Sequence, residues 1–223
     1  MSVAVIGAGL GGPSRVLATE FGAWIIGYEE SKELAEKGML HSVKAGLEGK
    51  APIQVYDPEN ADIFERTFDR AYSKEALYTV EDKKSLLKNI FENLKDGGFF
   101  LINDYTLESI EALADPDVQK LLRQEPIHPF PIPNKTLERL LLECGYILRI
   151  NEEITDVYID MITKSWLGVD KVIESLSKQE EDKSGTINCL IKELEFWALR
   201  SKILKKVHIK VWRFLAYKPG EVK

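Results

Sequence analysis

The chain has 223 residues, which is enough for one sizeable α/β domain with a helical elaboration. It is 44% hydrophobic and 30% charged, as in ordinary globular proteins, and 30 basic against 36 acidic residues give it a net charge of −6. This charge argues against nucleic acid as the main partner, because phosphate binding needs a basic face. No apolar run approaches the roughly 18 residues of a transmembrane helix, and no signal peptide precedes the first predicted strand. Cys144 and Cys189 match no metal-binding spacing and no disulfide framework, so we expect a cytoplasmic protein without a metal site.

The first dozen residues combine a short apolar strand, a glycine-rich turn and the start of a helix. Residues 3–6 are small β-formers, four glycines follow between positions 7 and 12, and Pro13 stands near the first helical position, where a missing N–H costs least. Glycines let the backbone approach a ligand, and the N–H groups at the helix N-terminus face it. A plain strand-to-helix turn seldom needs four glycines, so the pattern favours a cradle for a nucleotide-type cofactor.

The spacing of these glycines fits two cofactor classes. Gly7-x-Gly9-x-x-Gly12 satisfies the dinucleotide pattern of NAD and FAD enzymes. Gly7-x-Gly9-x-Gly11 fits the glycine pattern of S-adenosylmethionine (SAM) methyltransferases. The turn alone does not choose between them.

Apolar runs and helical periodicity alternate along the rest of the chain. We expect further strands over residues 23–28, 52–56, 68–73, 99–103, 146–150 and 207–217. We expect helices over residues 13–21, 32–37, 81–94, 107–123 and 135–144, a short helix with loops within 38–49, and a glycine turn over 95–98. Four prolines within residues 126–133 predict a stiff, extended loop, and residues 154–206 have a helical pattern. The order describes a doubly wound α/β sheet.

Acidic residues follow several of the predicted strands, at the edge of the sheet where ligands bind in such folds. Glu29 ends the second strand, where a carboxylate can accept both ribose hydroxyls of an adenosine; the alternative is a charge at the N-terminus of a helix capped by Ser31. Its neighbour Glu30 is expected to be solvated. Asp57 follows the third strand, and Asp104 follows the fifth, where it either faces the substrate or caps the next helix.

Three stretches resemble class I SAM-dependent methyltransferases. Residues 68–80 resemble the segment after the fourth strand of that family, and residues 86–105 resemble its glycine turn and fifth strand. Residues 9–15 resemble the small-molecule branch that includes phosphoethanolamine, sterol and glycine-derived amine methyltransferases. The resemblance covers about residues 3–146 and, weakly, the last strand. An NAD or FAD enzyme would share only the first motif.

The resemblance implies a fold, a reaction and a set of residue roles. The fold is a Rossmann-like sheet of seven strands, six parallel and the last antiparallel, with a helical insertion before the final strand. The reaction is in-line transfer of the SAM methyl group to nitrogen or oxygen of a small molecule, leaving S-adenosylhomocysteine; positioning and desolvation supply most of the rate. Gly7, Gly9 and Gly11 would cradle the methionine part of SAM, Glu29 would hold the ribose, Asp57 would bind the adenine amino group, and Tyr72, Ser73 and Glu75 would line the space between SAM and substrate.

The expected domains follow from the same resemblance. Residues 1–153 would form the SAM-binding core, residues 154–206 the helical insertion, and residues 207–223 the closing strand and tail. Helices that usually cover SAM upstream of the first strand are absent from this sequence. Either the sequence has a shortened or unusual start, or the insertion supplies the cover; we expect the insertion to serve as a lid or as a contact within a homo-oligomer.

The chain also departs from the family at two positions. Val5 stands where these enzymes usually carry an acidic residue that helps to hold the cofactor. Tyr78 lies near the position of a histidine in the phosphoethanolamine branch, which makes Tyr78 a candidate acid/base residue despite its ordinary pKa near 10. A catalytically weakened SAM-binding or scaffold protein is therefore one alternative, and an NAD(P) or FAD oxidoreductase is the other.

Three further residues are candidates on their chemistry. His128 lies in the proline-rich loop, where it is either a catalytic residue or part of a rigid connector. Trp166 and Trp197 could form an aromatic cage for a methylated ammonium group, although aromatic residues in helices more often belong to the core.

Overall fold

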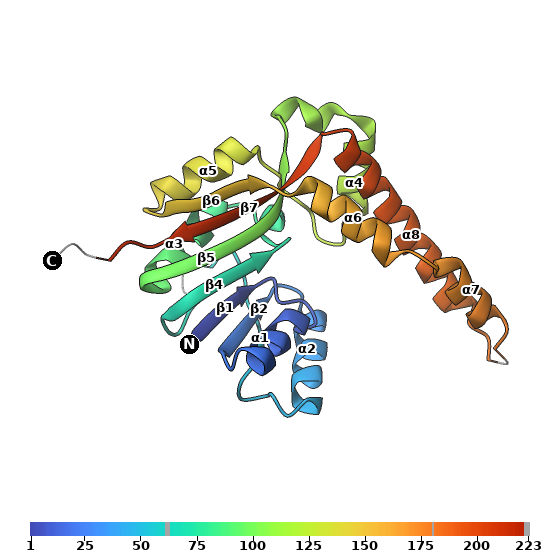
Figure 1. Ribbon diagram of the computed structural model, residues 1–223, viewed down its shortest axis with the longest axis horizontal. Coiled ribbons are helices and arrows are strands. Elements are labelled where there is room, and N and C mark those ends of the chain that lie inside the picture. The colour runs from blue at the N-terminus through green and yellow to red at the C-terminus, as the bar shows by residue number, and fades with distance from the viewer. Residues whose placement is uncertain (61–62, 180, 221–223) are drawn as a thin grey trace.

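The computed structural model describes residues 1–60, 63–179 and 181–220. Its centre is a seven-stranded sheet in the order β3-β2-β1-β4-β5-β7-β6 (Figure 1). The strands are β1 (Ser2–Ile6), β2 (Trp24–Glu29), β3 (Ile53–Val55), β4 (Phe68–Lys74), β5 (Leu94–Leu107), β6 (Ile147–Glu153) and β7 (Ile209–Tyr217). β7 pairs antiparallel with both β5 and β6, and the pairs from β3 to β5 are parallel. The predicted Rossmann-like sheet with an antiparallel last strand is confirmed.

Eight α-helices and two short 3₁₀ helices connect the strands within the described residues. The α-helices are α1 (Gly12–Glu20), α2 (Lys32–Lys44), α3 (Lys83–Asn93), α4 (Pro116–Gln124), α5 (Asn134–Glu143), α6 (Thr155–Ser165), α7 (Val169–Ser177) and α8 (Ser184–Lys205). The 3₁₀ helices are η1 (Leu77–Thr79) and η2 (Ile110–Ala114). None of the helices in the described ranges has the length and apolar composition needed to cross a membrane.

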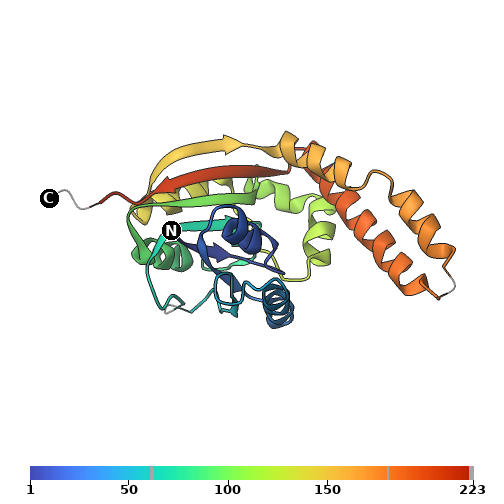
Figure 2. The same ribbon diagram turned by 60° about the horizontal axis from the view of Figure 1, so that its bottom comes forward.

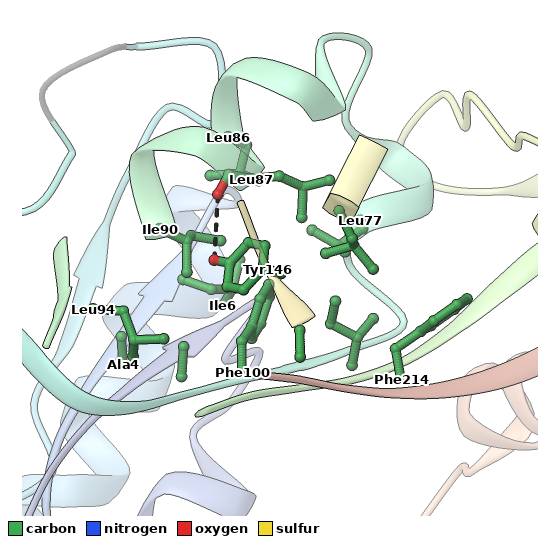
Figure 3. Packing of buried hydrophobic residues seen from close by; sticks show 14 of the residues in the cluster. Ala4, Ile6, Leu77, Leu86, Leu87, Ile90, Leu94, Phe100, Tyr146 and Phe214 are labelled. Atoms are coloured by element: carbon green, nitrogen blue, oxygen red, sulfur yellow. Dashed lines mark hydrogen bonds between the residues drawn. The ribbon is translucent and has the colours of Figure 1, made fainter. Parts of the chain in front are cut away.

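One face of the sheet packs against α3 and α5. Phe100 of β5 is fully buried there among leucines and isoleucines of the two helices, and Figure 3 shows the strand side chains pointing at Leu86 and Ile90 of α3. The Tyr146 hydroxyl donates a hydrogen bond of 3.3 Å to the carbonyl oxygen of Leu87, which satisfies a buried polar group. Burial of each of the phenylalanine, leucine and isoleucine side chains on this face contributes about 1.5–3 kcal/mol to the free energy of folding.

The other face of β1 and β2 packs against α1 and α2. Val3, Val5 and Ile25 meet Ala18 of α1 and Ala35 of α2, all of them buried. The small alanines bring both helices close to the strands. Val5, the departure from the family pattern, is therefore a core residue of this face.

Two elements differ in length from the prediction, each for a packing reason. α2 continues past Gly38, where the predicted helix ended. The glycine instead permits a close approach of the turn, because a Cβ atom at this position would lie 3.0 Å from the Gly9 carbonyl oxygen. β5 begins at Leu94 and runs to Leu107, so residues 95–98 form an irregularity in the strand rather than a separate turn. The predicted helix over residues 107–123 accordingly shortens to η2 and α4.

The insertion between β6 and β7 consists of α6, α7 and α8, which project beyond one end of the sheet (Figures 1 and 2). The C-terminal end of α8 and one side of α6 pack with α4, β5 and β7 in a second apolar cluster. α7 lies at the far end of the projection and contains no buried residue. The role of the insertion as lid or oligomer contact stays a prediction, and residues 221–223 of the expected tail lie outside the described residues.

We expect Arg200→Met to lower the free energy of unfolding by about 3–5 kcal/mol, because it leaves a buried carboxylate without its partner. Arg200 of α8 forms an ion pair with Glu125, just after α4, and both side chains are about 5% exposed. Urea unfolding measures the change. The control is Lys202→Met on the same helix, which removes an exposed ion pair with Asp117 and should cost less than about 1 kcal/mol. Equal losses in the two variants would contradict this account of the pair.

Candidate active site

The glycine turn after β1 is shaped by two different constraints. Gly7 has φ +69°, and a Cβ atom there would lie 2.2 Å from Cβ of Ala76, so the turn and the segment after β4 are in direct contact. Gly9 has φ +54°, and a Cβ atom there would meet no atom within 4 Å. The space in front of Gly9 is open, which is what a cofactor lying against the backbone requires.

Glu29 joins the end of β2 to this turn. Its carboxylate is buried; Oε2 accepts a hydrogen bond of 2.7 Å from the Gly9 N–H, and Oε1 accepts one of 3.0 Å from the Ser31 N–H. Ser31 in turn caps α2 by accepting from the Leu34 N–H. Two carboxylate oxygens offer about four acceptor positions, so both oxygens keep capacity for a ribose hydroxyl. The arrangement at Glu29 and the open space at Gly9 fit an adenosyl cofactor.

An open cleft of about 610 Å³, here named the acidic cleft, begins next to Glu29. Its lining residues are Glu30, Val55, Tyr56, Asp57, Pro58, Glu59, Thr79, Glu81, Ile127, His128 and Phe130. The cleft brings together the predicted site residues Asp57 and His128. The ring of exposed His128 stands edge-on to Phe130, with 4.9 Å between the ring centroids.

Glu30 is half-buried in this cleft rather than fully solvated, which corrects the expectation for it. Burial, followed by the nearby carboxylates of Glu29 and Asp57, raises the pKa of Glu30. The cleft therefore gathers several carboxylates and carries negative charge. Such a cleft suits the N–H donor groups of a nucleobase and suits a positively charged ligand.

A second pocket, of about 460 Å³, opens between the end of β4 and the insertion; we name it the aromatic pocket. Its lining residues are Lys74, Glu75, Tyr158, Met161, Ile162, Ser165, Trp166 and Trp197. Lys74 Nζ lies 3.2 Å from Glu75 Oε1 and 5.7 Å from the centroid of the Tyr158 ring. Trp166 and Trp197 are half-buried. They line the pocket, as an aromatic cage would, and they also pack on the apolar cluster of the insertion, as core residues would.

Glu75 places the aromatic pocket next to the glycine turn. It has φ +57°, which is uncommon for a residue with a side chain, and its N–H donates to the Asn103 carbonyl oxygen at 2.8 Å. The following residue, Ala76, contacts Gly7. The segment from Glu75 to Thr79 thus separates the two cavities, with Glu75 facing the aromatic pocket and Thr79 facing the acidic cleft.

The remaining predicted site residues, Tyr72, Ser73 and Tyr78, lie in different parts of the fold. Tyr72 lies on the side of the sheet that faces α1, and burial raises its pKa. Ser73 is fully buried, and its hydroxyl has no hydrogen-bond partner among the described residues. Tyr78 lines neither the acidic cleft nor the aromatic pocket; it is buried beside Tyr105 and Arg200, and desolvation raises its pKa well above 10. Such a group keeps its proton at neutral pH.

Three residues in or near these cavities were missed by the sequence analysis or only partly understood. Tyr158 comes from the insertion, where no motif marks it. Lys83 is buried under the proline-rich loop, and no motif marks it in the sequence. Asp104 accepts hydrogen bonds of 2.7 Å from the N–H groups of Leu77 and Tyr105, so it fixes η1 against β5 rather than capping the following helix.

We expect Asp104→Asn to change how stability depends on pH. Burial raises the pKa of Asp104 from 3.8 to about 7, so the folded state keeps a proton that the unfolded chain releases. The stability contributed by the protonated carboxyl is fully present below pH 3.8 and is lost as the pH rises to about 7. Urea unfolding between pH 4 and pH 8 should show the wild type losing stability relative to the variant over this window. A difference in unfolding free energy between the wild type and Asp104→Asn that stays constant with pH would contradict the raised pKa of Asp104.

A family model described as a methyltransferase domain matches residues 6–149. The chain belongs to this family. Phosphoethanolamine N-methyltransferase 3 of Arabidopsis thaliana is 24% identical over 179 residues, which are 78% of this chain and 35% of that protein. Sterol 24-C-methyltransferase of Saccharomyces cerevisiae is 23% identical over 154 residues, 68% of this chain and 40% of that protein. The methyltransferase-domain chain thus spans less than half of each of these relatives.

Solved structures agree on the fold of this methyltransferase domain. Phosphoethanolamine N-methyltransferase 2 of Haemonchus contortus, in complex with SAM, aligns with a TM-score of 0.81 at 19% identity, covering 99% of this chain and 49% of that one. A putative sarcosine dimethylglycine methyltransferase of Galdieria sulphuraria aligns with a TM-score of 0.76 at 18% identity, covering 98% of this chain and 78% of that one. The class I methyltransferase resemblance is confirmed, and the oxidoreductase alternative loses its support.

Proposed function

We propose that this domain binds SAM against the glycine turn and transfers the methyl group to nitrogen or oxygen of a small molecule in the aromatic pocket. The observation that supports this most is the position of the segment after β4. Its residue Glu75 faces the aromatic pocket, while the next residue, Ala76, touches Gly7 of the turn. An acceptor in the pocket would therefore lie beside a cofactor held at the turn.

The cofactor would extend from the glycine turn into the acidic cleft. Gly7, Gly9 and Gly11 would accept the methionine part, with the open space at Gly9 as the point of closest approach. Glu29 would bind the ribose hydroxyls through its free acceptor positions. Asp57 in the cleft would accept a hydrogen bond from the adenine amino group.

The reaction would depend on positioning more than on covalent chemistry. SAM supplies a methyl group on a sulfonium; a lone pair of the acceptor forms the new bond to carbon as the carbon–sulfur bond breaks, and S-adenosylhomocysteine leaves. Glu75 is the carboxylate of the aromatic pocket and would receive the proton that the acceptor loses. The walls formed by Tyr158 and Trp197 would exclude water and stabilise a cationic acceptor or product.

Tyr78 and His128 remain predictions as catalytic residues. The raised pKa of Tyr78 suits a hydrogen-bond donor better than a base. His128 lines the acidic cleft, so it would contact the cofactor rather than the acceptor.

Turnover tests the proposal. The purified chain is incubated with SAM and panels of small amines, amino acids, phenols and alcohols, and release of S-adenosylhomocysteine is measured. We expect release with one acceptor class, strongly reduced in Glu75→Gln and unchanged in Glu33→Gln, which alters an exposed carboxylate on α2. Release that is equal in Glu75→Gln and the wild type would contradict the role of Glu75.

A second candidate is a SAM-binding protein without turnover. Val5 favours it, because this position is packed into the apolar face of the sheet and offers no carboxylate to the cofactor. Binding of S-adenosylhomocysteine without release from any acceptor would support this candidate. The cytoplasmic location, the absence of nucleic acid as a partner and a homo-oligomer built through the insertion belong to the same proposal; Cys144 and Cys189, both free thiols, suit a reducing compartment.

A further inference from the structure

The proline-rich loop after α4 forms one wall of the acidic cleft. It contributes Ile127, His128 and Phe130 to the lining. Thr79 and Glu81, from the segment that follows β4, line the cleft beside this loop. The paths of these two segments shape one side of the cleft, and neither segment belongs to a regular helix or strand at these positions, apart from the single turn of η1.

One buried ammonium group joins the two segments. Lys83 is 4% exposed, and its Nζ donates hydrogen bonds of 2.6 Å to the carbonyl oxygens of Val80 and of Phe130. Val80 lies between the lining residues Thr79 and Glu81, and Phe130 itself lines the cleft. A single side chain therefore fixes both backbones at the level of the cleft.

A second hydrogen bond reinforces the same connection. The Phe130 N–H donates to the Tyr78 carbonyl oxygen at 2.6 Å, so Phe130 is held through both its backbone groups. The loop is also tied at its beginning, where Glu125 forms the buried ion pair with Arg200. Between the two fixed residues, Glu125 and Phe130, the loop presents Ile127 and His128 to the cleft.

Burying a lysine is costly unless its ammonium group is well satisfied, which makes this contact informative. Desolvation lowers the pKa of Lys83 to about 8, while the carboxylates of Asp104 and Glu59 oppose the shift. The group is therefore largely charged at neutral pH, and charged donors make stronger hydrogen bonds to carbonyl oxygens than neutral donors do.

We propose that Lys83 is a positioning residue that fixes the two lining segments to each other, and thereby sets the shape of this side of the acidic cleft and the affinity for the adenosyl part of the cofactor. The inference rests on the proposed function, which places the adenine in that cleft. Without the ammonium group, the carbonyl oxygen of Phe130 loses its partner, and the loop moves away from Thr79 and Glu81. The cofactor then has to order the loop on binding, and this lowers its affinity.

Three variants of the full chain test this proposal by isothermal titration with S-adenosylhomocysteine. Lys83→Met keeps the length of the side chain but removes the donors, and we expect the Kd to rise about tenfold or more. Lys83→Arg keeps the charge and has donors for both carbonyls, so its Kd should lie within about threefold of the wild-type value. The control is Lys84→Met, the exposed neighbour on α3 paired with Glu143, which should leave the Kd unchanged.

Hydrogen exchange supplies a readout without ligand. We expect the Phe130 amide to exchange faster in Lys83→Met than in the wild type, and at the wild-type rate in Lys84→Met. A Kd in Lys83→Met equal to that of the wild type would overturn the proposal, and so would equal losses in the Met and Arg variants with unchanged exchange at Phe130. If the wild type binds no S-adenosylhomocysteine, the proposed function fails, and a changed exchange rate would then leave Lys83 as a clamp of the loop without a role in cofactor affinity.

Discussion

We expect Glu29→Gln to weaken binding of SAM and S-adenosylhomocysteine by about 2–3 kcal/mol, which is about 30- to 140-fold in Kd. The carboxylate accepts the N–H groups of Gly9 and Ser31 and would accept the ribose hydroxyls as well. Glutamine has the same shape, but its amide NH₂ replaces one acceptor by a donor that faces a backbone N–H. The substitution therefore disturbs the turn and the ribose contact together. Isothermal titration measures the affinity.

Glu33→Gln is the matched control for this result. Glu33 lies in the first turn of α2, is exposed and pairs with Lys37, so the same chemical change occurs four residues away without touching the turn. Its Kd should equal that of the wild type. If Glu29→Gln bound as tightly as Glu33→Gln, the cofactor would not lie at the end of β2.

Gly7→Ala should lower the free energy of unfolding by about 2–5 kcal/mol and abolish cofactor binding at micromolar concentrations. The positive φ of Gly7 costs an alanine about 1–2 kcal/mol. The added Cβ would lie 2.2 Å from Cβ of Ala76, and forcing the two apart costs about 1–3 kcal/mol more. Because Ala76 follows Glu75, the movement would displace both cavities. Urea unfolding and titration with S-adenosylhomocysteine measure the two effects.

Gly12→Ala separates the role of Gly7 from a general effect of glycine loss. Gly12 begins α1, has no positive φ, and a Cβ atom there would meet nothing within 4 Å. We expect its stability to stay within about 1 kcal/mol of the wild type, since alanine is the better helix former. If Gly7→Ala and Gly12→Ala lost similar amounts of stability, the contact with Ala76 would not be the reason for a glycine at position 7.

Much of the fold could be predicted because local patterns carry it. The apolar run of β5 and the stripe of Leu86 and Ile90 on α3 each define their element without knowledge of the rest. Element ends were less predictable, because tertiary contacts decide them. Gly38 lies inside α2, where the glycine turn passes close to it, and β5 extends to Leu107 because β7 pairs with residues 99–107.

The arrangement of the candidate site could be predicted where it depends on strand ends. The edge of a parallel sheet brings Glu29 and the glycine turn together, and a direct hydrogen bond joins Glu29 to Gly9. Parts that depend on loop paths and on the insertion were not predictable. Nothing in the sequence near Tyr158 indicates that it meets Glu75, and a lysine at position 83 gives no local sign that it will be buried between two loops.

Titration of the purified chain with SAM and S-adenosylhomocysteine, with NADH and FAD as controls, tests the central claim most directly. The glycine turn, Glu29 and the acidic cleft together predict binding of both adenosyl ligands at micromolar Kd and no binding of NADH or FAD. Binding of neither adenosyl ligand, or tighter binding of NADH or FAD, would contradict the assignment of this site to SAM.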